Sequence, residues 1–155
     1  MITLLEELVD RADGTYANAK DLRALEHIMS SWSERKEAYL AIQAKEELIL
    51  DRAIELMEKD HPTHEKRTNN SGVDCCRRDL ALTLRSYALG MLLQDEEMLK
   101  DRMLYWQKSI FQAMDLSKYQ GFKYLLESLY LELSVAQADL CKPYFNIARD
   151  IILSN

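Results

Sequence analysis

The apolar residues of this chain recur at intervals of three and four, which is the spacing of one face of an α-helix. No stretch of strand length alternates β-branched with polar residues, and only 4 Gly and 2 Pro interrupt the pattern. A half-buried β-strand would instead show apolar and polar residues in strict alternation. The pattern therefore predicts an all-α fold.

A short helix is predicted at the N-terminus. Thr3 and Glu6 have the spacing of a capping box, and Gly14 is placed to end the helix. Two short helices cannot hide the apolar face of this segment alone, so we expect them to form a hairpin that packs on a partner subunit. The residues of that face are Leu4, Leu5, Leu8 and Val9.

The rest of the chain is predicted as longer helices. Asp95 stands where a helix N-cap is expected, and Pro143 stands near the start of the last helix. A polar segment over residues 61–72 predicts the main loop. The helices are expected over residues 21–60 (as two helices with a bend), 73–93, 96–114, 117–133 and 143–152.

Length and charge narrow the class of protein. The 155 residues, 48% of them apolar, have the size of one domain, which we expect to span residues 1–155. The net charge of -6 disfavours nucleic acid and anionic membrane surfaces as partners. No uncharged run approaches the roughly 20 residues of a membrane span, so no membrane insertion is expected.

The cysteines carry no pattern of a disulfide framework. Cys75, Cys76 and Cys141 are an odd set of three, and no basic segment precedes the first apolar residues as it would in a signal peptide. We therefore expect reduced thiols and a cytoplasmic location. A cysteine with a special role in this chain would therefore act through the reactivity of its thiol.

The most informative segment reads Cys76-Arg77-Arg78-Asp79, followed by Leu84-Arg85 and by Leu99-Lys100-Asp101-Arg102. In order and spacing it resembles the phycobiliprotein family, in which Cys, any residue, Arg and Asp begin the central helix and a Gly-Asp pair closes it. The segment from Val9 to Asp13 is similar to the opening of β-type chains. The resemblance covers essentially the whole chain.

The resemblance implies a globin-like phycobiliprotein fold with an N-terminal helical hairpin extension. It implies a β-type antenna subunit of the phycobilisome that passes on excitation energy from one covalently bound phycobilin, a linear tetrapyrrole. The implied partners are an α-type subunit or a second copy, in dimers and ring-shaped oligomers, together with linker proteins. The implied location is the cytoplasm or plastid stroma, at the thylakoid surface. Asp13 and Arg85 match residues that form a salt bridge between the two subunit types.

The residue types also suit such a pigment chemically. A flexible tetrapyrrole must be tethered, and Cys76, near the start of a helix, can form a thioether because terminal amide groups favour the thiolate. Asp79, on the same helical face, can accept pyrrole N–H groups and keep them charged. Arg78 offers a forked donor to a propionate. Linkage through Cys75 instead of Cys76 stays open.

The loop ahead of the cysteines departs from the family. Residues 66–74 lack the Gly-Gly-Asn turn and paired Arg of β-type chains, and Asp74 would repel a propionate. Phe111 stands where many β-type chains have Tyr. Cys141 falls too early to match a second pigment cysteine, so at most one pigment is expected.

The sequence leaves one main alternative function and disfavours three others. A paralogue that kept the fold and lost the pigment would be a structural or regulatory partner protein. Haem needs a His in the second half of the chain, where none occurs. A zinc site from His61, His64 and the vicinal cysteines has no standard ligand spacing. Catalysis is not expected, because the sequence offers no paired nucleophile and base, phosphate loop or clustered carboxylates.

Overall fold

The computed structural model describes residues 1–60, 70–113 and 121–153. Within these ranges the chain is helical and contains no strand, so the predicted all-α class is confirmed. No helix in the same ranges is long and apolar enough to cross a membrane. The elements in order are α1 (Ile2–Arg11), α2 (Ala19–Ser30), α3 (Trp32–Ala44), α4 (Glu46–Asp60), α5 (Asn70–Leu93), α6 (Glu96–Leu99), the π-helix η1 (Lys100–Leu104), α7 (Tyr105–Ala113), α8 (Gly121–Glu132) and α9 (Val135–Leu153).

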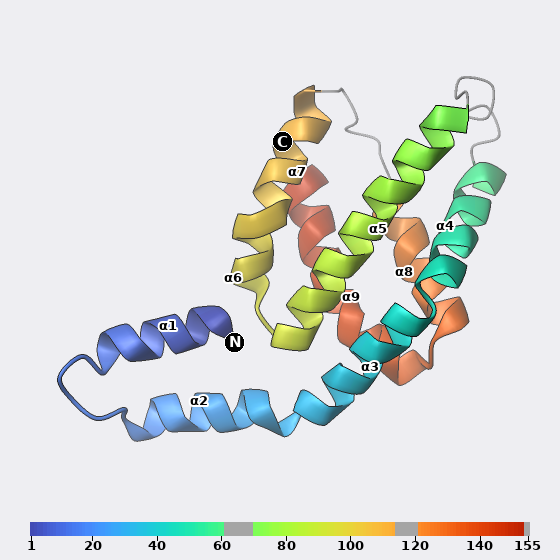
Figure 1. Ribbon diagram of the computed structural model, residues 1–155. Helices are drawn as coiled ribbons and strands as arrows, with labels where there is room; N and C mark the ends of the chain where they lie inside the picture. The colour runs from blue at the N-terminus through green and yellow to red at the C-terminus, as the bar shows by residue number, and fades with distance from the viewer. Residues whose placement is uncertain (61–69, 114–120, 154–155) are drawn as a thin grey trace.

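The helices from α3 onward form the body of the protein, and α1 and α2 extend from it as an arm (Figure 1). In the body, α4 packs along α8, while α5 contacts both α3 and α9. The arm contacts the body where α1 meets α6 and where α2 joins α3. This is the expected globin-like fold with an N-terminal helical hairpin extension.

The long helix α5 supplies much of the core. Leu84, Tyr87 and Met91 recur at helical spacing and are almost completely buried. The Tyr87 ring meets Phe145 of α9 edge-on at 4.9 Å and Phe122 of α8 in a stack at 6.2 Å. Burial of one such side chain contributes roughly 1.5–3 kcal/mol, so α5 is held firmly against its neighbours.

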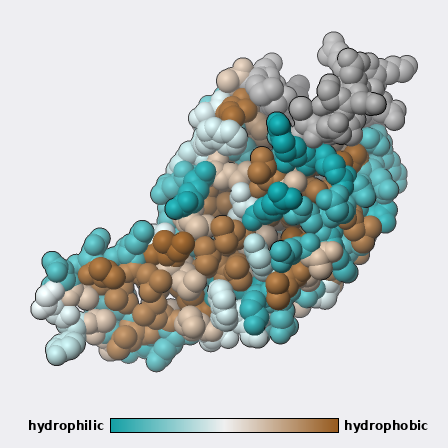
Figure 2. Space-filling model, viewed as in Figure 1, coloured by the Kyte–Doolittle hydropathy of each residue, from teal (hydrophilic) through white to brown (hydrophobic). Residues whose placement is uncertain are grey.

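The arm has almost no core of its own. α1 contains no buried residue, and α2 buries only Asp21, whose carboxylate accepts a hydrogen bond from Arg11 at 2.9 Å. Figure 2 shows apolar side chains gathered over the arm, on the surface. The exposed apolar residues of α1 and α2 are Ile2, Leu5, Val9, Leu22 and Met29. The arm thus does not fold back over the body, and its packing on a partner stays a proposal.

Helix ends follow from local chemistry at several positions. Asn18 caps α2 by accepting hydrogen bonds from two backbone N–H groups, and Asp95 caps α6 through Met98 N–H, as predicted. Gly14 lies in the turn after α1 with φ at 68°, a conformation that glycine adopts without strain. Gln94 adopts a similar φ of 49° at the end of α5.

Two predictions for the N-terminal third are wrong. Thr3 does not open a capping box; Met1 is the N-cap of α1, and the Thr3 side chain is hydrogen-bonded to the distant Asp95. Residues 21–60 form three helices instead of two, because the chain breaks at Ser31 and again at Lys45.

Other boundaries also differ from the prediction. α5 begins at Asn70, so part of the predicted loop is helix, while residues 61–69 lie outside the described ranges. The helix expected over residues 96–114 is divided by η1, and residue 114 is not described. Pro143 lies well inside α9, although the prediction placed it near the start. The capping box at residues 117–120 also lies outside the described residues.

Candidate functional site

Cys76 lies on α5 between the core and the surface. Its side chain is half-buried and packs against the apolar core. Because α5 begins at Asn70, Cys76 lies in the second turn, where backbone N–H groups bond within the helix. Cys76 thus lies deeper in the helix than the sequence predicted, and the effect of terminal amide groups on its thiol stays a prediction.

Arg78 and Asp79 project from α5 beside this cysteine. The Arg78 side chain is 71% exposed and the Asp79 side chain 65% exposed, and their nearest charged atoms are 3.7 Å apart. An exposed ion pair of this length contributes little to stability. Both side chains can therefore turn toward another group at small cost.

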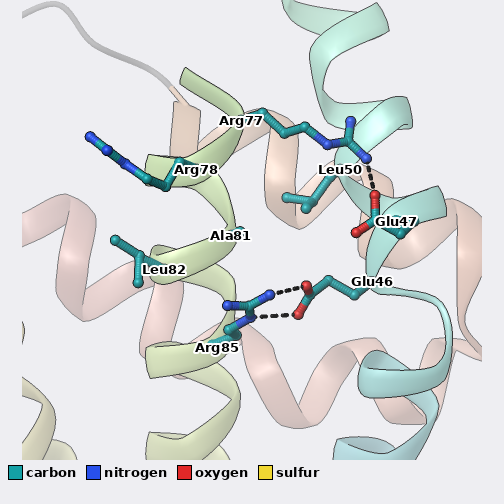
Figure 3. Close-up of a pocket in the computed structure, with 8 residues that line it drawn as sticks. All are labelled: Glu46, Glu47, Leu50, Arg77, Arg78, Ala81, Leu82 and Arg85. Carbon is teal, nitrogen blue, oxygen red and sulfur yellow. Dashed lines mark hydrogen bonds and ion pairs between the residues drawn. The ribbon is translucent and has the colours of Figure 1, made fainter. Parts of the chain in front are cut away.

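Arg77 and Arg85, on the same helix, are placed quite differently. Arg77 is bound to Asp51 at 2.5 Å and to Glu47, both on α4. Arg85 donates from Nε to Glu46 at 2.8 Å and from Nη2 to the other carboxylate oxygen. These pairs tie α4 to α5 (Figure 3).

The charges in these pairs are mutually stabilised. The hydrogen bond from Arg85 lowers the pKa of Glu46, and hydrogen bonds to Glu47 and Asp51 raise the pKa of Arg77.

An open cavity of about 260 Å³ lies between α4 and α5. Its lining residues are Glu46, Glu47, Leu50, Arg77, Arg78, Ala81, Leu82 and Arg85. In Figure 3, Arg78 points away from α4, in contrast to Arg77.

The two residues matched to a subunit contact are both at the surface. Asp13 is exposed in the turn after α1, and Arg85 is exposed but engaged by Glu46 of the same chain. The structure does not bring Asp13 and Arg85 together as a pair. Sequence reasoning missed Glu46, although a run of acidic residues at the start of α4 was a visible signal.

A network of three buried polar side chains lies C-terminal to Cys76 on α5 and on α7. Tyr87 donates to Gln107 of α7 at 3.3 Å, and Gln107 donates to Thr83 at 3.3 Å. All three side chains are buried. Sequence reasoning missed this network, because single polar residues within apolar helix faces do not reveal their partners.

Cys141 has the properties of a core residue. It is 2% exposed on α9, and burial raises the pKa of its thiol to about 12. A neutral, inaccessible thiol is a poor nucleophile. Cys141 is therefore a poor candidate for covalent attachment of any group in the folded chain.

No cluster of three potential metal ligands occurs among the residues that the structure describes. His61, His64 and the Cys75 side chain lie outside the part of the chain that the structure describes. The zinc hypothesis is therefore not tested at its histidines. His27, which is described, is exposed on α2.

The residues around Cys76 fit a linear tetrapyrrole by their chemistry. They offer a partly accessible thiol, a carboxylate that can accept pyrrole N–H groups and a guanidinium that can bind a propionate. These three groups could tether an extended, anionic pigment, accept its N–H groups and bind its carboxylate.

Comparison with known proteins identifies the family of the chain. No match to the chain was found among the curated proteins. A family model described as phycobilisome protein matches residues 8–152, nearly the whole chain. Proteins of that family are pigment proteins of light harvesting and not enzymes. The chain therefore belongs to the phycobilisome protein family.

Proposed function

We propose that this chain is a β-type subunit of the phycobilisome that carries one phycobilin, bound through a thioether to Cys76. One observation supports the site most strongly. Along α5, Arg77 and Arg85 are held by carboxylates of α4, whereas Arg78 and Asp79 pair loosely with each other beside Cys76. The two side chains that a pigment would need are thus the two that can reorient.

Each residue of the proposed site has a distinct role. A bound tetrapyrrole would supply visible absorption and pass its excitation to neighbouring subunits. Cys76 would tether it, the Asp79 carboxylate would accept its pyrrole N–H groups and favour their protonated form, and Arg78 would bind a propionate. Cys75, the adjacent thiol, is the alternative tether.

The proposed partner is an α-type subunit or a second copy of the chain, in dimers and ring-shaped oligomers to which linker proteins bind. The exposed apolar residues of the arm support this, since an uncovered face of this kind is typical of an interaction surface. Asp13 of one subunit would reach Arg85 of the other. Such an assembly would lie at the thylakoid surface.

A pigment-free paralogue is the second candidate. One observation favours it: Cys76 lies past the first turn of α5, deeper in the helix than the sequence predicted. In that case the same arm and helical body would serve a structural or regulatory role in the antenna.

The roles of the charged residues are tested by spectra of the pigment-loaded protein. Asp79→Asn should keep the pigment attached but weaken and shift its red absorption, because the neutral amide no longer favours the protonated pyrroles. Arg78→Ala should broaden the band. The matched control is Arg77→Ala, which should lower thermal stability and leave the spectrum unchanged. A spectrum altered by Arg77→Ala and not by Arg78→Ala would contradict the assignment.

A further inference from the structure

The carboxylate of Asp95 is bonded to two different helices. As N-cap of α6, it accepts a hydrogen bond from Met98 N–H at 3.0 Å through Oδ1. It also accepts from Thr3 of α1 twice, from the backbone N–H at 2.8 Å through Oδ2 and from the hydroxyl at 2.8 Å through Oδ1. The Met1 amino group donates to Oδ2 at 3.1 Å.

The first turn of α1 depends on hydrogen-bond acceptors outside the helix. The first N–H groups of any helix lack partners within it, and in α1 the N–H of Leu5 is the one that bonds back to Met1. The N-cap Met1 provides no side-chain cap, and no residue of α1 is buried. Little packing therefore holds α1, and polar contacts at its first turn weigh correspondingly more.

Asp95 itself is firmly placed. Its side chain is 2% exposed, and the turn that carries it follows the well-packed end of α5. A carboxylate with hydrogen bonds to both oxygens is held in one orientation, and a buried acceptor that loses a donor is costly. The α5–α6 turn thus offers α1 a rigid attachment point.

The second helix of the arm is attached to the same turn. Arg35 is buried and donates to the carbonyl of Leu92 at the end of α5 and to the carbonyl of Ile28 near the end of α2. Its Nε donates to the Ser31 hydroxyl at 3.1 Å, and that hydroxyl donates to Gln94 Oε1 at 3.5 Å. Carbonyls at helix C-termini are favourable partners for a cation, so Arg35 ties α2 to α5 without a carboxylate.

We infer that Asp95 is a shared cap for α6 and α1, and that it holds the first helix of the arm in place against the body. It is a positioning residue for the arm. This inference depends on neither the pigment nor a partner. It implies that the direction of the arm is set within the single chain, before any subunit contact.

The test is amide hydrogen exchange, measured by mass spectrometry on the full chain. In Asp95→Asn the amide oxygen can still accept from Met98, but its NH2 group cannot accept from Thr3 N–H. Exchange in α1 should become about tenfold faster, the effect of losing one helix cap, while α6 keeps its protection. Thr3→Val, which removes only the hydroxyl, should cause a smaller increase confined to α1.

Asp10→Asn is the matched control, because Asp10 is an exposed carboxylate on α1 itself. It should leave the exchange of α1 unchanged. Unaltered α1 exchange in both Asp95→Asn and Thr3→Val would overturn the inference. Equal loss of protection in α1, α6 and the core, or the same effect from Asp10→Asn, would overturn it too.

Discussion

Arg85 of α5 and Glu46 of α4 form a two-point ion pair within one chain, with Arg85 Nε 2.8 Å from a Glu46 oxygen. The resemblance assigns Arg85 to a contact with Asp13 of another subunit. A carboxylate from a partner must therefore share the guanidinium with Glu46 or displace it. The planar guanidinium still has Nη1 for a further acceptor.

This competition predicts opposite effects for two variants on subunit association. Asp13→Asn should weaken association, because the partner loses its carboxylate, and Glu46→Gln should strengthen it, because Arg85 is released. Sedimentation of the purified subunits at low and high salt would measure both effects, which should shrink as salt screens exposed charges. Glu37→Gln, at an exposed position of α3, is the control. Unchanged association in both variants would remove Asp13 and Arg85 from the interface.

The positive φ of Gln94 predicts a stabilising substitution. A residue with a Cβ pays roughly 1–2 kcal/mol in the left-handed region, and glycine does not. Gln94→Gly should therefore raise the free energy of unfolding by about 1 kcal/mol, measured by urea denaturation.

Gly14→Ala is the reverse experiment at a φ of 68°, where an added Cβ would meet no atom within 4 Å. It should lower the free energy of unfolding by a similar amount. A loss of stability in Gln94→Gly would show that the Gln94 side chain contributes more than its backbone costs.

Asp95 makes the stability depend on pH in the acid range. Burial alone would raise its pKa, but hydrogen bonds from Met98, Thr3 and the N-terminal amino group hold the pKa down to about 2, below the ordinary 3.8. A depressed pKa in the folded state adds stability that is present above pH 4 and is lost as the pH falls toward 2. At 1.36 kcal/mol per pKa unit, the contribution is about 2 kcal/mol.

Urea denaturation between pH 5 and pH 2 would test this effect. The wild-type chain should lose about 2 kcal/mol more over that range than Asp95→Asn, which cannot titrate. Identical pH profiles for the two proteins would contradict the role of Asp95.

The two described cysteines should differ in reactivity. Cys141 is buried and its thiol has a pKa raised to about 12, whereas Cys76 is half-buried. In the native, pigment-free protein at pH 8, iodoacetamide should modify Cys76 and leave Cys141 intact until the chain unfolds. Peptide mass spectrometry would report both sites. Modification of native Cys141 at the rate of Cys76 would disprove the assignment of Cys141 to a closed core.

Much of the fold could be predicted from the sequence because it depends on local spacing. Apolar periodicity identified the helices, and Asp95 was recognised as an N-cap. Thr3 shows the limit of such reasoning. Its spacing to Glu6 fits a capping box, yet its actual partner is 92 residues away in sequence. Local patterns do not reveal which distant carboxylate will occupy a donor.

The candidate site also has a part that the sequence predicts and a part that depends on distant packing. The motif of Cys76, Arg78 and Asp79 lies on α5, where Arg78 and Asp79 are exposed and Cys76 is half-buried. The difference between Arg77 and Arg78 was not predictable, because it depends on the packing of α4 beside one face of α5.

The most direct measurement is covalent pigment attachment. The chain would be co-expressed with bilin-producing enzymes and a suitable lyase, and pigment would be detected by zinc-enhanced fluorescence on a denaturing gel. The account predicts a fluorescent band that is lost in Cys76→Ala and kept in Cys75→Ala. A band lost only in Cys75→Ala would move the linkage by about 100° around the helix. A chain that stays colourless with every lyase, and colourless when isolated from its source, would contradict the antenna function and support the pigment-free paralogue.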